Sequence, residues 1–142
     1  MIGQDRALEI VEGALSVDGA DEVEVTLFGE SGGLTRFADS AIHQHTERSD
    51  AQVRVRVVRG KRVAAATTNR LDAESIAAAG RQALEMATLS PPDDLFPGLP
   101  GDFGASLLPA AEAAARFDEA TAGATPGWRA SRVAEVVRTA GD

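Results

Sequence analysis

Two histidines separated by one residue, in the stretch SAIHQHTERSD (residues 40–50), are the first candidates for chemistry. Alternate residues of a β-strand point to the same face, so His43 and His45 would present two imidazoles side by side, as many metal sites do. Glu47 would continue the row. However, same-face residues of one strand are about 7 Å apart, and three ligands in a straight row converge poorly on one ion. We therefore expect no metal site in this stretch.

Motifs of a self-contained active site are missing from the sequence, which contains neither a phosphate-binding P-loop nor a zinc-protease helix. The stretch GESGG at residues 29–33 looks like a fragment of a serine-nucleophile motif. It follows a strand without the helix that should succeed it, so a tight glycine turn is the expected role. We expect no catalytic residues in this chain.

Composition and charge exclude several functional classes. The net charge of −8 argues against a general nucleic-acid binder, and a chain without cysteine has neither disulfides nor thiolate metal sites. The N-terminus lacks the cationic start and apolar run of a signal peptide, and no stretch approaches the roughly 20 apolar residues of a membrane span. We expect a cytoplasmic protein with no direct nucleic-acid partner and no membrane partner.

Positive charge is concentrated between residues 36 and 62, which carry seven basic residues against three acidic ones. Two interpretations remain open. Basic side chains can simply cover exposed sheet, which we favour, or they can form a surface that contacts an anion or a peptide. The basic residues are Arg36, Arg48, Arg54, Arg56, Arg59, Lys61 and Arg62.

The periodicity predicts an α+β fold with an N-terminal helix over residues 4–16 and an antiparallel meander of about four to five strands. The alternation in DEVEVTLFG predicts the first strand, which should end at Gly29 and the Gly32–Gly33 pair. The remaining strands are expected over residues 34–38, 41–48, 51–58 and 62–68.

Two-residue hairpin loops at Ser49–Asp50 and Gly60–Lys61 would join the last three runs. Loops of this length fix the register and give a largely apolar face. The residues expected to lie opposite one another on the three strands are Ile42, Val57 and Ala64, then Gln44, Val55 and Ala66, then Thr46, Val53 and Thr68.

The opposite face of the same sheet would be polar. It would place His45 opposite Arg54 and His43 opposite Arg56. Two fixed positive charges would repel a metal ion, which is a second argument against a metal site.

A second helix should cover residues 73–89, with Asp72 in a suitable N-cap position and a stripe of small residues for packing on a sheet. The next segment holds four of the six prolines and cannot continue a regular element. A helical turn within residues 109–117 and a last helix starting at Thr125–Pro126 complete the chain. The small-residue stripe consists of Ile76, Ala79, Gly80, Ala83 and Ala87.

These features divide the chain into an α+β N-terminal domain (1–90), a Pro/Gly-rich linker (91–109) and a helical tail (110–142). The valines of the last helix, at positions 133, 136 and 137, would need a partner. We therefore expect the tail to lead to a second domain that this sequence does not include.

The order of these features resembles the N-terminal domain of the TldD/PmbA family, also called the modulator of DNA gyrase family. The resemblance is carried by GADEVEV before the first strand, by VRVRVVRGKRVAAATTNRLDAESIAAAGRQALEMA for the strand pair and helix, and by FDEATAGATPGWRASRVAEVVRTAG near the end. It covers nearly the whole chain and is weakest from residue 93 to 116. The specificity lies in the order of the motifs.

The resemblance implies a non-catalytic N-terminal domain. Members of that family are cytoplasmic zinc metallopeptidases, or similar partner subunits without the metal motif, which form dimers around a closed chamber and cut unfolded peptides. Their zinc ligands lie in a helix motif of the C-terminal half, so no cofactor is expected in this chain. Whether the parent is of the catalytic or the metal-free type stays open.

The implied partners are a peptide or unfolded protein and a homologous subunit of the same family. His43, His45, Arg54 and Arg56 are the candidate peptide-binding residues, because a sheet can accept a peptide as an added strand while a cationic face selects its side chains. The alternative is a stand-alone small α+β binding protein that acts through the basic strand face. The unpartnered valines of the last helix favour the first interpretation.

Overall fold

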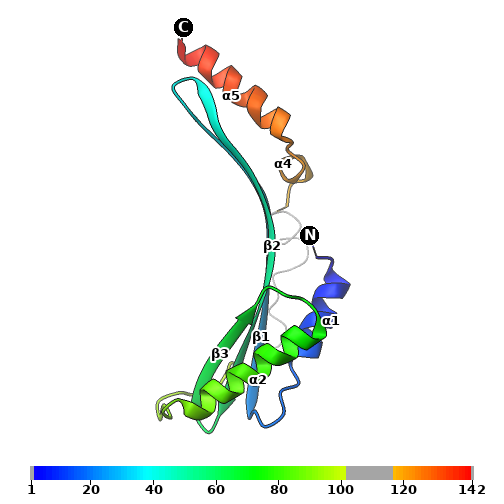
Figure 1. The fold of residues 1–142 in the computed structure, drawn as a ribbon, viewed down its shortest axis with the longest axis vertical. Coiled ribbons are helices and arrows are strands. Elements are labelled where there is room, and N and C mark those ends of the chain that lie inside the picture. Colours follow the sequence, from blue (N-terminus) through cyan, green and yellow to red (C-terminus); the bar gives the residue numbers. More distant parts are fainter. Residues whose placement is uncertain (1, 102–116, 142) are drawn as a thin grey trace. The chain divides into compact units, whose positions relative to one another are not determined.

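The structure, a computed structural model, describes residues 2–101 and 117–141 (Figure 1). The described residues form an N-terminal helix, three strands and three further helices. In chain order these are α1 (Gln4–Ala14), β1 (Glu22–Ala38), β2 (Ala41–Arg59), β3 (Arg62–Thr68), α2 (Ala73–Leu89), α4 (Glu119–Ala122) and α5 (Pro126–Gly141).

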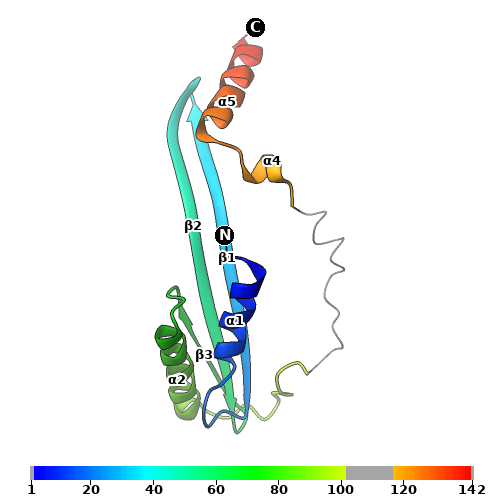
Figure 2. The same cartoon turned by 90° about the vertical axis from the view of Figure 1, so that its right-hand side faces the viewer.

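The strands form one sheet in the order β1-β2-β3, in which β1 and β2 make a long hairpin (Figure 2). The hairpin turns at Asp39 and Ser40, whose φ angles are 49° and 60°. β2 and β3 are joined by Gly60 and Lys61, with φ angles of 54° and 60°. Two successive left-handed residues make a type I′ turn, the two-residue turn whose twist matches that of the flanking strands.

The α+β class with an N-terminal helix and an antiparallel sheet is confirmed, but the sheet has three strands rather than four to five. The predicted break at Gly29 and Gly32–Gly33 is wrong, because these residues lie inside β1. The predicted loop at Ser49–Asp50 is also wrong, because both residues lie inside β2. Glycine, serine and aspartate favour turns locally, but a neighbouring strand that pairs with their backbone overrides that preference.

The register of β2 against β3 is as predicted, with Val57 opposite Ala64, Val55 opposite Ala66 and Val53 opposite Thr68. The predicted pairs between residues 42–46 and the valines are wrong, because both sets lie on the same strand, β2.

The chain forms two compact units. Among the described residues, unit 1 contains residues 2–30 and 50–101, and unit 2 contains residues 31–49 and 117–141. β1 and β2 contribute residues to both. None of the described helices is long and apolar enough to cross a membrane.

The core of unit 1 lies between one face of the sheet and the helices α1 and α2. Val53, Val55 and Val57 of β2 are 0 % exposed, and full burial of a valine stabilises a fold by about 1.5–3 kcal/mol. The predicted small-residue stripe of α2 is buried throughout. The other members of the cluster are Ile10 and Ala14 of α1, Ala66 of β3, and Ile76, Ala79 and Ala83 of α2.

The N-cap of α2 is formed as predicted. The Asp72 carboxylate accepts a hydrogen bond from the Ser75 backbone N–H at 2.9 Å and a second from the Ser75 hydroxyl at 2.9 Å. These bonds, the backbone one first, hold the pKa of Asp72 below its usual value of 3.8.

The proline-rich segment after α2 has no helix or strand through residue 101, as predicted. It is nevertheless tied to unit 1. The backbone N–H of Asp93 donates to the Lys61 carbonyl at 2.9 Å, and the N–H of Leu99 donates to the Glu22 carboxylate at 2.7 Å. The predicted division at residues 90 and 109 stays a prediction.

The last helix begins at Thr125–Pro126 as predicted, with the Thr125 hydroxyl accepting from the Trp128 backbone N–H at 3.2 Å. Its valines are not buried, and Val136 is 54 % exposed. The helical turn predicted within residues 109–117 lies almost entirely outside the described residues.

We expect Gly80→Ala to lower the free energy of unfolding by about 1 kcal/mol. A methyl group at position 80 would lie 2.9 Å from Cγ2 of Val17. Overpacking of this kind costs about 1–3 kcal/mol, against a gain in helix propensity of about 1 kcal/mol. Urea unfolding followed by circular dichroism measures the change.

The contact between positions 80 and 17 can be tested by combining Gly80→Ala with Val17→Ala. The second substitution removes the methyl groups that the new side chain at position 80 would meet. The two substitutions should couple favourably by about 1 kcal/mol. A Gly80→Ala protein more stable than the wild type would contradict the tight packing of α2 on Val17.

We expect Asp72→Asn to destabilise the protein at neutral pH and to have little effect in strong acid. The folded-state pKa of Asp72 is lowered, so its carboxylate stabilises the fold above its unfolded pKa and loses this effect as pH falls through the folded value. Asparagine keeps a cap acceptor but carries no charge. Urea unfolding at neutral pH and near pH 2 measures the difference. Glu74→Gln is the control, because it removes one negative charge from the same helical turn and leaves the N-cap residue unchanged.

Candidate functional site

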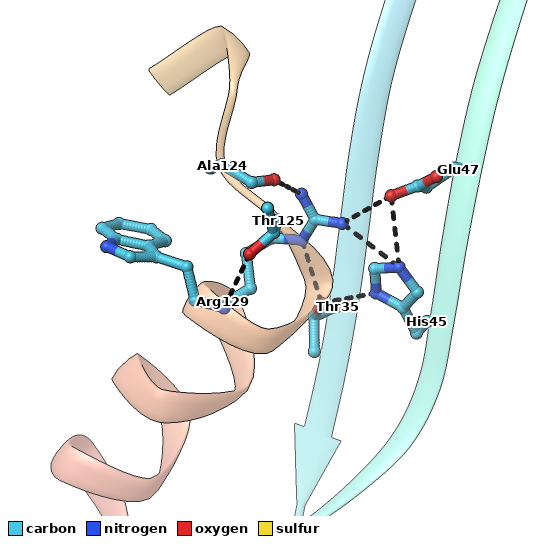
Figure 3. Close-up of polar contacts among 7 residues, drawn as sticks. Thr35, His45, Glu47, Ala124, Thr125 and Arg129 are labelled. Carbon is cyan, nitrogen blue, oxygen red and sulfur yellow. Dashed lines mark hydrogen bonds and ion pairs between the residues drawn. The ribbon is translucent and has the colours of Figure 1, made fainter. Parts of the chain in front are cut away.

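A polar cluster around Arg129 is the candidate site in unit 2 (Figure 3). Arg129 lies in the first turn of α5, where its backbone N–H donates to the Thr125 carbonyl at 3.0 Å. Its side chain leaves the helix toward the β1–β2 hairpin and is only 17 % exposed. The cap at Thr125 therefore determines where the guanidinium lies.

The Arg129 guanidinium contacts both strands of the hairpin and the loop before α5. Its Nη1 donates to the Ala124 carbonyl, and its Nε donates to the Thr35 hydroxyl at 3.3 Å. Its Nη2 lies 3.2 Å from Nε2 of His45 and 3.3 Å from Oε1 of Glu47. One side chain thus connects three segments of the chain.

These contacts fix the tautomer of His45. Arginine can only donate hydrogen bonds, so Nε2 of His45 must accept from Arg129. The proton then lies on Nδ1, which donates to the Thr35 hydroxyl at 2.9 Å. The Thr35 oxygen accepts from both His45 and Arg129. Both ring nitrogens are therefore engaged in contacts within unit 2.

Gly33 of β1 makes room for the guanidinium. A Cβ atom at this position would lie 2.5 Å from both Nη atoms of Arg129. The neighbouring Gly32 has nothing within 4 Å of the same position. Only Gly33, of these two glycines, is required for the close approach of Arg129 to the strand.

A hollow of about 490 Å³ lies beside the cluster. Residues 31–33 of β1, residues 47–49 of β2 and the segment 122–126 before α5 line it together with Arg129. The lining mixes backbone, small side chains and charged groups, which suits a polar ligand or a peptide backbone better than an apolar one.

The four predicted peptide-binding residues do not come together. His45 belongs to the Arg129 cluster, while Nε2 of His43 contacts the Ala38 carbonyl at 2.9 Å beside the hairpin turn. Arg54 and Arg56 lie in unit 1, on the face of β2 opposite the buried valines. The predicted facing pairs His45–Arg54 and His43–Arg56 are wrong, because all four residues lie on β2.

Arg54 and Arg56 differ in their surroundings. Arg56 donates to the Glu24 carboxylate at 2.8 Å, and its Nε is buried without a hydrogen-bond partner among the described residues. Arg54 is exposed, opposite Thr67 of β3, and forms no ion pair with another described residue. Arg54 is therefore the more accessible of the two cations.

The described residues do not fit a zinc ion. They contain no group of three or more histidine, aspartate and glutamate side chains that could hold a metal. His45 and Glu47, whose Nε2 and Oε1 atoms are 3.6 Å apart, both have the positively charged Arg129 within 3.3 Å.

Arg129 is the residue that the sequence interpretation missed. It contacts Thr35 and His45, which precede it by 94 and 84 residues. The predicted helix start at Thr125–Pro126 gave its secondary structure, and no local pattern indicated its partners. The glycine pair at 32–33 is the one signal available, because a glycine inside a strand often marks a close approach of another group.

Two comparisons with known proteins found a match. Residues 23–87 match the family model described as PmbA/TldA metallopeptidase domain 1. A search of curated proteins found no match. Among solved structures, TldE from Thermococcus kodakarensis is similar, with a TM-score of 0.59 and 23% sequence identity over 67% of this chain and 21% of that chain. The predicted resemblance to the N-terminal domain of the TldD/PmbA family is confirmed over residues 23–87.

This chain spans about a fifth of the length of the TldE structure that it matches. At 23% identity the likeness to TldE shows a shared fold. The activity and partners of a whole protein are therefore matters for proposal.

We expect Gly33→Ala to displace Arg129 from His45, because the added methyl would occupy the place of the guanidinium. Gly32→Ala is the matched control, since it adds the same methyl one residue away in open space. The imidazole ¹⁵N chemical shifts of His45, measured by NMR, report the loss of the hydrogen bond to Nε2. They should change in Gly33→Ala and stay as in the wild type in Gly32→Ala. Equal changes in both variants would contradict the arrangement.

Proposed function

Because residues 23–87 match the first domain of the TldD/PmbA family, we propose that this chain is the non-catalytic N-terminal part of a TldD/PmbA-type zinc metallopeptidase that degrades or processes unfolded peptides. Its proposed roles are to form part of the chamber wall, to contact a homologous subunit and to help hold the peptide. The family match over the strands and α2 is the observation that carries this proposal.

Hydrolysis is assigned to another part of the parent protein. The described residues offer no metal-binding group, and both ring nitrogens of His45 are occupied by Thr35 and Arg129. Zinc would be held, in a catalytic parent, by the C-terminal half of the protein, and the protein would act in the cytoplasm.

The sheet of unit 1 supplies a means of holding an extended peptide. Among the described strands, β3 lies at the edge of the sheet, so one side of its backbone has no strand neighbour in that part of the chain. A peptide added there would lie two strand spacings, or about 10 Å, from β2. Arg54 lies opposite Thr67 of β3 and could reach an acidic side chain of such a peptide.

A binding experiment with the 142-residue chain tests the peptide role. Fluorescence anisotropy of a labelled, unstructured peptide should rise on titration, and the free peptide should remain uncleaved. Arg54→Gln should weaken binding of an acidic peptide by about two- to fivefold, as expected for one exposed ion pair.

Arg81→Gln is the matched control, because Arg81 is also exposed but lies on α2. It should leave peptide affinity unchanged. Absence of binding to any unstructured peptide, together with binding of a small anion that depends on Arg54, would favour the alternative of a stand-alone binding protein.

A further inference from the structure

A second hollow in unit 2 is apolar and lies between α5 and the end of the hairpin. Its volume is about 410 Å³. Figures 1 and 2 both show α5 beside this end of the hairpin. The apolar lining residues are Ile42 of β2 and Ala130, Val133, Ala134 and Val137 of α5, with Ser40 of the turn at the edge.

The lining follows the helical repeat. Ala130 and Ala134 lie one turn apart, and Val133 and Val137 form the parallel row. The two alanines leave space above the helix that larger side chains would fill. No described residue of unit 2 is buried, so these apolar side chains are not part of a buried core within the unit.

One of the described residues that line the hollow is charged. Arg138 lies in the last turn of α5, one turn after Ala134, and none of the described lining residues is acidic. Arg129 of the same helix belongs to the His45 cluster, and Arg132 pairs with Glu135 at 2.7 Å. Arg138 makes no hydrogen bond or ion pair with another described residue. Its guanidinium is available to an anion.

We propose that this hollow binds the C-terminal end of a peptide, with an apolar side chain between Ile42 and α5 and the terminal carboxylate on Arg138. Along α5 the apolar lining residues are followed by the cation Arg138. In a peptide, the apolar side chain of the last residue is likewise followed by the terminal carboxylate. Arginine donates two parallel hydrogen bonds to a carboxylate, so the charge also orients the peptide. The inference rests on the proposed function and names the part of the peptide that unit 2 would hold.

The test uses the 142-residue chain and two fluorescein-labelled unstructured peptides of identical sequence, ending in leucine as the free acid or as the amide. We expect the free acid to bind about fivefold more tightly, and Arg138→Gln to remove that difference. Arg132→Gln is the control on the same helix and should preserve it. A third peptide, amidated and carrying an internal aspartate, separates a terminal carboxylate from an acidic side chain.

The apolar part is tested by Ala134→Leu, which fills the hollow and should weaken the free acid about tenfold. Ala140→Leu adds the same side chain to α5 outside the hollow and should have no effect. Circular dichroism of each variant checks that α5 is retained.

Equal binding of acid and amide, unchanged by Arg138→Gln or Ala134→Leu, would overturn the inference and leave the peptide role of the chain in place. Equal binding of the aspartate peptide and the free acid would overturn the assignment to a C-terminus. Failure of the wild type to bind any of the three peptides would count against the peptide role as well.

Discussion

The burial of Val53, Val55 and Val57 against α1 and α2 is the interaction on which unit 1 depends. These side chains are 0 % exposed, and the small residues of α2 let the helix approach them closely. Because alternate side chains of a strand point to opposite faces, the intervening Arg54 and Arg56 lie on the face opposite these three valines. The same alternation that builds the core thus supplies the cations that could contact a peptide.

Unit 2 is held by different forces. None of its described residues is buried, and the hydrogen bonds of Arg129 to Thr35, His45 and Ala124 connect α5 to the hairpin. Hydrogen bonds that compete with water stabilise a structure by about 0.5–1.5 kcal/mol each, less than the burial of a large apolar side chain. Between the described parts of the two units, unit 2 is therefore the one more able to adjust its structure when a ligand or partner binds.

Local signals in the sequence were sufficient for the parts of the fold that depend on local physics. The Asp72 cap, the small-residue stripe of α2 and the alternation of the β2 valines were predicted and are present. The strand breaks were wrong, because continuation through Gly32–Gly33 and Ser49–Asp50 depends on the partner strand. A cation does lie next to His45, but it is Arg129. A contact between residues that are 84 positions apart produces no periodic pattern in the sequence.

Strands β1 and β2 make contacts in each unit that depend on how the strands are aligned. In unit 1 the Asp21 N–H donates to the Val58 carbonyl at 2.8 Å, and in unit 2 Thr35 and His45 meet at 2.9 Å. A slip of β2 by one residue would turn its valines out of the core and would also separate Thr35 from His45. Burial of the valines therefore selects one alignment of β2 within unit 1, whereas the exposed residues of unit 2 could by themselves tolerate several alignments.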